Sequence, residues 1–229
     1  MKTIGIIGGI TWLSSADYYR LLNEKINLRL GESNAAKLIL YSVNFEEIKK
    51  LTFAGDWNAI SRIVCDIAKK LELAGADCLL IGANTMHKIA ADIQAAVSIP
   101  LIHVAVQTGA AIHKKGLKKV ALLGTRYTME MNFYPDKLSE SGITTIIPDG
   151  EDRQYIHDAI YNEMGKGHFL AATKERILSI ISKLTAAGAE GIVLGCTEIP
   201  ILIKQEDCAA VLFDTTDIHA TAAVDFALG

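Results

Sequence analysis

The sequence lacks several features that mark specialised classes of protein. Its 229 residues include only four cysteines, which stand singly and form neither the paired spacings of a zinc site nor a redox motif. Basic residues are not in surplus, with 23 lysines and arginines against 26 acids, which argues against nucleic acid as a partner. No apolar run reaches the ~18 residues of a membrane span, and the glycine-broken start predicts a strand rather than a signal peptide. We therefore expect a cytoplasmic protein with reduced thiols, no membrane association and no metal site.

What the chain does contain is an alternation of short apolar runs with longer amphipathic stretches. Half of its residues are hydrophobic, enough for a sizeable core. The alternation is typical of repeated βα units around a parallel sheet, so the predicted fold class is α/β. Strands are predicted at 3–7, 37–43, 78–82, 101–103, 119–123, 144–147, 191–195 and 211–213, and helices at 14–30, 57–73, 88–97, 104–114, 128–140, 152–164, 170–186 and 217–228.

The two halves of the sequence resemble each other. Residues 71–85 align without a gap with residues 184–198, and residues 2–8 align with 118–124. So long a period indicates a duplicated half-domain, because solenoid repeats recur every ~20–50 residues. We expect an N-terminal half at 1–103 and a C-terminal half at 104–216, with the last helix, about 217–229, packing back on the first. A pseudo-twofold relation would place Ala83 and Cys196 on facing walls of one cleft, which is the expected active site.

Ligands of open α/β sheets bind beyond the carboxyl ends of the strands, so the residues there are the first candidates. Gly9, Ile10 and Thr11 follow the first strand, where a glycine permits close backbone approach and helix-start amides can hold an anion. The alternative is a tight turn that binds nothing. The segment is not a GxGxxG fingerprint, and no acidic residue ends the second strand, which weakens the case for a dinucleotide.

Short neutral donors follow three other strands. Together they are suited to holding a small carboxylate without a cationic clamp, whereas each alone is equally typical of a helix cap. The convergence of donors from both halves favours a binding site. These residues are Asn84, Thr85, Thr125, Thr128 and Thr197.

Cys196 is the strongest candidate for a nucleophile or base. A helix start and nearby donors are expected to lower the pKa of its thiol, and the alternative is a buried, inert cysteine. Glu198 is placed to orient that thiol or a substrate ammonium group, and Arg126, otherwise a surface residue, to meet a side-chain carboxylate. His87 and His219 are either proton carriers or packing residues.

Taken together, these segments resemble the aspartate/glutamate racemase family, and most closely its broad-specificity bacterial amino-acid racemases. The resemblance covers essentially the whole chain and rests on Gly8-Gly-Ile-Thr-Trp12, Asn84-Thr-Met-His-Lys88, Leu123-Gly-Thr-Arg-Tyr-Thr-Met129 and Gly195-Cys-Thr-Glu-Ile199. It implies a cofactor-independent isomerase made of two pseudo-symmetric halves, a small amino-acid substrate and a homodimer. It also implies that Thr52 and Gly167 lie where relatives recognise the distal group of the substrate.

In that family two thiols act on opposite faces of the amino acid, one removing the Cα proton and the other returning it. The second thiol maps onto Cys196, whereas the first maps onto Ala83, which carries no proton. The resemblance therefore implies a racemase of reduced or one-sided activity on aspartate-like or glutamate-like amino acids, with water, Thr85 or His87 in place of the missing thiol. The alternatives are a one-thiol lyase or hydrolase, a carboxylate-binding protein without turnover, and an engineered substitution at position 83.

Overall fold

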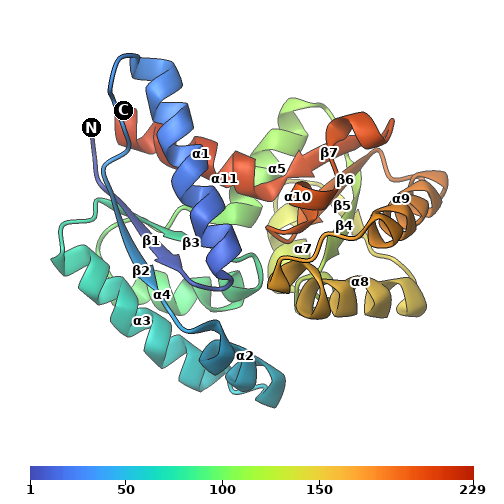
Figure 1. Ribbon diagram of the computed structural model, residues 1–229, viewed down its shortest axis with the longest axis horizontal. Coiled ribbons are helices and arrows are strands. Elements are labelled where there is room, and N and C mark those ends of the chain that lie inside the picture. The colour runs from blue at the N-terminus through green and yellow to red at the C-terminus, as the bar shows by residue number, and fades with distance from the viewer. The chain divides into compact units, whose positions relative to one another are not determined.

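Seven parallel strands form two separate sheets in the computed structural model, which describes residues 1–229 (Figure 1). Each sheet belongs to one of two units, Met1–His103 with His219–Gly229 and Val104–Ile218. The prediction of an α/β chain with two parallel-sheet halves is confirmed.

The sheet of the first unit has three strands in the order β2-β1-β3. Its strands are β1 (Ile4–Gly8), β2 (Leu38–Ser42) and β3 (Cys78–Ile81). Its helices are α1 (Trp12–Leu30), α2 (Phe45–Ala54), α3 (Trp57–Leu73), the 3₁₀ helix η1 (Thr85–Ile89), α4 (Ala90–Ala96) and the greater part of α11 (Thr215–Leu228).

Both faces of this sheet are covered, because alternate strand residues point to opposite sides. Ile7 and Ile81 pack with α3 and α4, whereas Ile6 and Leu80 pack with α1 and α11. Figure 1 shows α3 on one side of β1 and β3 and α1 on the other. The apolar runs that predicted these strands are therefore the runs of a sheet buried on both faces.

The second unit is built around a four-stranded sheet in the order β5-β4-β6-β7. Its strands are β4 (Lys119–Gly124), β5 (Thr144–Ile146), β6 (Gly191–Gly195) and β7 (Val211–Asp214). Its helices are α5 (Val104–Lys114), α6 (Arg126–Glu130), α7 (Phe133–Ser139), α8 (Gly150–Asn162), η2 (Met164–Lys166), α9 (Ala171–Ala186), α10 (Ile199–Leu202) and η3 (Gln205–Asp207).

Here too the alternation of side chains fills two layers. Leu123 and Leu194 pack with α8 and α9, and Leu122 and Val193 pack with α5 and α7. The side of the sheet that carries α8 and α9 also holds Cys196.

The two sheets repeat one topology. In each, the first strand is central and pairs in parallel with the next strand on one side and with a later strand on the other. Ile7 pairs with Ile81 in the first sheet, and Gly124 pairs with Gly195 in the second. The residues that leave β3 and β6 therefore occupy equivalent places, Ala83 in one unit and Cys196 in the other.

Several predicted boundaries were wrong for local reasons. The predicted helix at 128–140 is two helices, α6 and α7, separated at Met131 and Asn132. The predicted strand at 101–103 is reduced to one bridge between Leu79 and Leu101. Residues 45–54, expected as loop, form α2, which Asn44 caps by accepting a hydrogen bond from the Glu46 amide at 3.2 Å.

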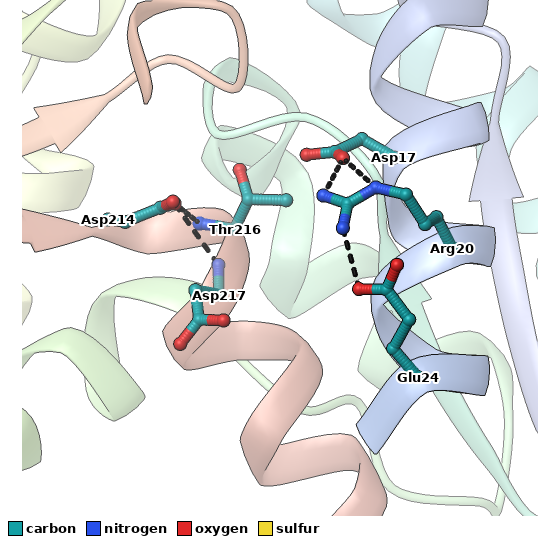
Figure 2. A network of polar contacts seen from close by, with 6 residues as sticks. All are labelled: Asp17, Arg20, Glu24, Asp214, Thr216 and Asp217. Carbon is teal, nitrogen blue, oxygen red and sulfur yellow. Dashed lines mark hydrogen bonds and ion pairs between the residues drawn. The ribbon is translucent and has the colours of Figure 1, made fainter. Parts of the chain in front are cut away.

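Polar contacts fix the starts and surfaces of helices in both units. Asp214 begins α11, because its Oδ1 accepts from the amides of Thr216 at 2.9 Å and Asp217 at 3.1 Å (Figure 2). On α1, the Arg20 guanidinium donates to Asp17 and Glu24 (Figure 2).

None of the helices combines the length and the apolar character needed to cross a bilayer.

Candidate active site

Cys196 leaves the end of β6 and lies beside a carboxylate. Its Sγ donates a hydrogen bond to Glu198 Oε2 at 2.9 Å, and the Thr197 hydroxyl donates to the same oxygen at 2.9 Å. All three residues are buried. A thiol and a carboxylate in direct contact form a pair between which a proton can move.

The expectation of a lowered thiol pKa at Cys196 was wrong. Burial raises the pKa of the Cys196 thiol well above its ordinary range, and the Glu198 carboxylate raises it further by repelling a thiolate. The helix that follows, α10, has only four residues, so its start has little power to offset these effects. The resting form is a protonated thiol whose proton already points at a base.

Two threonines, Thr125 and Thr128, follow the strand next to the one that Cys196 leaves. Thr125 follows β4, which pairs with β6 so that Gly124 lies beside Gly195. A Cβ on Gly124 would lie 2.8 Å from the Gly195 carbonyl oxygen, so the two strand ends approach too closely for a side chain at that position. Thr125 Oγ1 also accepts from the Thr128 amide at 3.3 Å and caps α6. Thr125 is therefore a helix cap, and this role does not prevent it from also contacting a ligand.

An aromatic cluster from α6 and α8 adjoins the thiol and was missed by the sequence analysis. His157 packs between Tyr127, at a ring-centroid distance of 5.9 Å, and Tyr161, at 4.8 Å. Burial raises the pKa of Tyr161, and Cys196 and Glu198 lie near enough to contribute to that shift. The four-residue spacing of His157 and Tyr161 on one helix face is the only signal in the sequence that relates two of these residues.

In the first unit, Ala83 leaves β3 at the place equivalent to Cys196. It is a buried methyl group within the core that α3 and β3 share. Asn84 and Thr85 follow it and are also buried, but Asn84 makes no side-chain cap to η1. Of the two interpretations of Asn84, the cap is therefore excluded.

His87 is tied to this segment rather than free to carry protons. Its Nδ1 lies 3.0 Å from the Ala83 carbonyl oxygen, which as an acceptor requires the proton on Nδ1. Its ring packs 4.7 Å from that of His103 and 5.6 Å from that of His219. Burial lowers the pKa of His87, so the imidazole is neutral at pH 7.

His219 forms a hydrogen bond at each of its two ring nitrogens. Nε2 donates to the Ile102 carbonyl oxygen at 2.6 Å, which leaves Nδ1 to accept from the Tyr18 hydroxyl at 2.8 Å. Burial lowers its pKa to about 4. The interpretation of His87 and His219 as packing and anchoring residues is the one that this geometry favours.

The turn after β1 has a structural reason for its glycine. Gly9 has φ +86°, and a Cβ there would lie 2.3 Å from the Val43 carbonyl oxygen. The Gly9 amide donates to the Ser15 hydroxyl at 2.7 Å. Thr11 Oγ1 accepts from the Ser14 amide at 3.4 Å and so caps α1, and Ile10 is buried beside it. The tight-turn alternative accounts for these contacts.

Two further candidates lie away from the strand ends. Thr52 was placed in a loop by the sequence but lies in α2, where its hydroxyl donates to the Ile48 carbonyl at 2.8 Å. Gly167 ends η2 in a left-handed conformation, with φ 85°.

One cavity of the second unit lies away from Cys196. A cavity of about 650 Å³ borders edge strand β7 and includes Lys114, Lys204 and Phe213, but neither Cys196 nor Glu198. No group of three or more His, Cys, Asp or Glu side chains is arranged to hold a metal ion. Cys78 fits the inert-cysteine interpretation, since burial raises its pKa to about 12.

Comparison with known families assigns the chain. The model of the family described as Asp/Glu/hydantoin racemase matches residues 7–223. The chain belongs to this racemase family.

Solved structures in the family share the whole fold. A Yersinia pestis protein provisionally described as an Asp/Glu racemase is 43% identical, with 100% of both chains covered and a TM-score of 0.93. An aspartate racemase homologue from Pyrococcus horikoshii OT3 is 35% identical, again with 100% of both chains covered and a TM-score of 0.85.

A sequence relative of described activity matches over a shorter range. The broad specificity amino-acid racemase of Bacillus subtilis is 32% identical over 94 residues, which is 41% of each chain. The matched segment spans 41% of the length of that racemase and 63% of the length of a second curated relative, an uncharacterized protein of Pectobacterium carotovorum.

Proposed function

We propose that this chain is an amino-acid racemase-family isomerase that moves the Cα proton of aspartate-like or glutamate-like amino acids with a single thiol. The observation that carries the proposal is the buried hydrogen bond from Cys196 to Glu198 at the end of β6. The family membership supplies the class of reaction. No cofactor enters the proposed chemistry.

The pair explains how a thiol with a raised pKa acts as a base. In the resting state the proton is on Sγ and Glu198 is a carboxylate. The thiol proton passes to Glu198 Oε2, and the thiolate then removes the proton from Cα. In the reverse direction the Cys196 thiol protonates the carbanion, and the thiolate left behind takes back the proton held on Glu198 Oε2, which restores the resting pair. Each step moves one proton between two named atoms.

The substrate carboxylate needs donors while negative charge develops next to it. We assign this role to Thr125 and Thr128 after β4 and to Asn84 and Thr85 after β3. Thr197, also predicted to bind substrate, donates its one hydroxyl proton to Glu198 and must turn from it to contribute. Preplaced neutral donors in a dry site stabilise such charge without reorganising. Gly9, Ile10, Thr11, Thr52 and Gly167 complete the proposed set of substrate-binding residues.

The second face of the substrate is proposed to be served from the Ala83 side. Alanine has no proton to give, and His87 points its Nδ1 proton at a backbone carbonyl. Water is therefore the proposed proton donor on that face. Exchange of the Cα proton through Cys196 should then be faster than inversion, so the activity is one-sided.

Isotope exchange tests this function directly. With L- or D-aspartate and glutamate in D₂O, deuterium should enter at Cα, and Cys196→Ala should abolish that entry. The deuterium should appear mostly at Cα of the starting enantiomer, with its configuration retained, because inversion is slower than exchange. Failure to exchange any member of a broad amino-acid panel would overturn the proposal.

Two other outcomes of the same experiment identify the alternatives. If amino acids raise the thermal midpoint but no label enters, the chain is a carboxylate-binding protein. If a product other than an amino acid forms and depends on Cys196, it is a one-thiol lyase or hydrolase. Either result contradicts the proposed isomerase.

The proposal also includes a homodimer, as the resemblance implies. Its support is α5, an alanine-containing helix whose Val106 is exposed although the opposite side of the helix is buried. Sedimentation equilibrium of the wild type and Val106→Glu tests it. A monomer at micromolar concentration would contradict this part of the proposal alone.

A further inference from the structure

Arg126 is one of two arginines in this chain that form no ion pair with a carboxylate. Four of the six arginines form such pairs, namely Arg20, Arg29, Arg153 and Arg176. The other without one, Arg62, lies on α3 in the first unit, whereas Arg126 follows the strand beside β6. The Arg126 guanidinium is exposed, and its Nη2 meets the Tyr127 hydroxyl at 3.3 Å. The planar fork that binds a carboxylate is therefore open to solvent.

The place of Arg126 in the fold is set by strand register. Gly124 ends β4 beside Gly195 of β6, so Thr125 and Arg126 leave one strand where Cys196 and Thr197 leave its neighbour. Adjacent strands lie about 4.8 Å apart. An arginine side chain two residues past the end of β4 can therefore reach a ligand bound at Cys196.

The structure also holds Arg126 in position. Its backbone amide donates to His157 Nδ1 at 3.3 Å, and its guanidinium lies 5.2 Å from the centre of the Tyr127 ring. His157 is in turn packed between Tyr127 and Tyr161. An arginine supported in this way loses less conformational freedom on binding than a mobile one.

Charge supplies the reason for an arginine here. The threonines proposed to bind the substrate's α-carboxylate carry neutral hydroxyls, whereas the Glu198 carboxylate would repel a second carboxylate on the substrate. A guanidinium offsets that repulsion and binds the second carboxylate bidentately. An amide or an apolar side chain on the substrate would gain nothing from it.

We propose that Arg126 selects the substrate class by binding the side-chain carboxylate of an acidic amino acid. This inference rests on the proposed function and assigns the specificity of the same site. Lys166 is the other candidate for binding this side-chain carboxylate, because it adjoins Gly167, which the resemblance places near the distal group of the substrate.

The test compares acidic substrates with their neutral isosteres. Cα deuterium entry is measured for aspartate against asparagine and for glutamate against glutamine, as the ratio of kcat/KM values. Arg126→Gln should reduce the preference for the acid at least about tenfold, since a charge-assisted bidentate contact contributes at least 1.4 kcal/mol. Arg126→Lys should restore only part of it. Arg62→Gln, which removes an exposed arginine of the first unit that likewise forms no ion pair, is the matched control and should keep the preference.

A binding measurement that needs no turnover separates this inference from the proposed function. Succinate should raise the thermal midpoint of the wild type more than its monoamide, and Arg126→Gln should remove the difference. If that holds without any exchange, the isomerase proposal fails and the role of Arg126 stands. If exchange occurs but the preference survives Arg126→Gln, or is lost only in Lys166→Gln, the role of Arg126 is overturned.

Discussion

The Cys196 thiol donates its proton to the Glu198 carboxylate across 2.9 Å, inside a part of the second unit from which solvent is largely excluded. One residue, Thr197, separates them, and its hydroxyl donates a hydrogen bond to the same Glu198 Oε2 atom that accepts from Cys196. This relationship determines both the charge state of the thiol and the direction in which its proton can leave.

Glu198→Gln should lower the pKa of the Cys196 thiol while reducing its activity. The amide removes the negative charge that opposes a thiolate, although burial still keeps the pKa above its ordinary range. The same change removes the acceptor of the thiol proton, so Cα exchange should fall about 10²–10⁴-fold, the usual contribution of a positioned proton carrier. Thiolate absorbance across a pH titration measures the first effect, and deuterium entry measures the second.

Glu206→Gln, on the surface of η3, is the control for loss of one carboxylate from the same unit. It should change neither quantity. A Glu198→Gln protein with an unchanged thiol titration would show that burial alone holds the proton on sulfur.

Ala83→Cys should raise racemisation relative to exchange. The new thiol would stand at the position equivalent to Cys196 and supply the proton that alanine lacks, so a gain of about 10²-fold or more in inversion is expected. Chiral chromatography of the product gives the inversion rate. Ala83→Ser is similar in size but a much weaker acid, and it should gain far less. Equal gains for serine and cysteine would point to shape rather than proton transfer.

Acidification should destabilise the first unit before its carboxylates titrate. His219 has a pKa of about 4 in the folded chain and about 6.5 when unfolded, so below pH 6.5 the unfolded state binds more protons. Stability therefore falls as pH falls, by about 3 kcal/mol from this residue once pH 4 is reached. His87 and His157, whose pKa values burial also lowers, add to the same trend.

Urea unfolding between pH 7 and pH 5 measures this dependence above the range in which carboxylates protonate. His219→Gln should flatten the slope, at the expense of stability at pH 7, and His113→Gln on the exposed end of α5 should leave it unchanged. A free energy of unfolding that stays constant over this interval would contradict the assignment of neutral, buried imidazoles.

Gly9→Ala should be far more destabilising than Gly55→Ala. Both glycines have positive φ, 86° and 72°, which costs an alanine about 1–2 kcal/mol. Only at Gly9 would the new Cβ also strike backbone atoms, at 2.3 Å and 2.4 Å from Val43, whereas Gly55 faces open space. We expect a loss of about 3 kcal/mol or more at Gly9, measured by urea unfolding. Equal losses at the two positions would mean that the turn after β1 shifts to make room.

Much of the fold was predictable because its signals are local. The helix predicted at 57–73 is α3, Trp57–Leu73, and the central strands β1 and β4 lie within one residue of their predicted ranges. Apolar periodicity and end signals determine such elements. Helix α2 was missed because only Ile48 and Thr52 are buried, too few for a visible periodicity in ten residues. The break at Met131 had a signal in Pro135, whose nitrogen cannot donate to the Met131 carbonyl, and the predicted helix at 128–140 ran through it.

The candidate site was predictable in position but not in its electrostatics. Strand ends identify Cys196 and Ala83 from the sequence alone. The direction of the thiol pKa depends on how deeply Cys196 is buried and on which way Glu198 turns, and neither follows from spacing. The support of Arg126 by His157 is likewise invisible, because 31 residues separate them and only the packing of α6 on α8 brings them together.

The protonated state of Cys196 has a consequence for chemical damage. Peroxide and electrophiles attack thiolates, and thiols react far more slowly. A cysteine that yields its proton only to Glu198 presents almost no thiolate to such reagents at neutral pH. Cys196 is therefore expected to react with peroxide and electrophiles more slowly than a cysteine held as a thiolate.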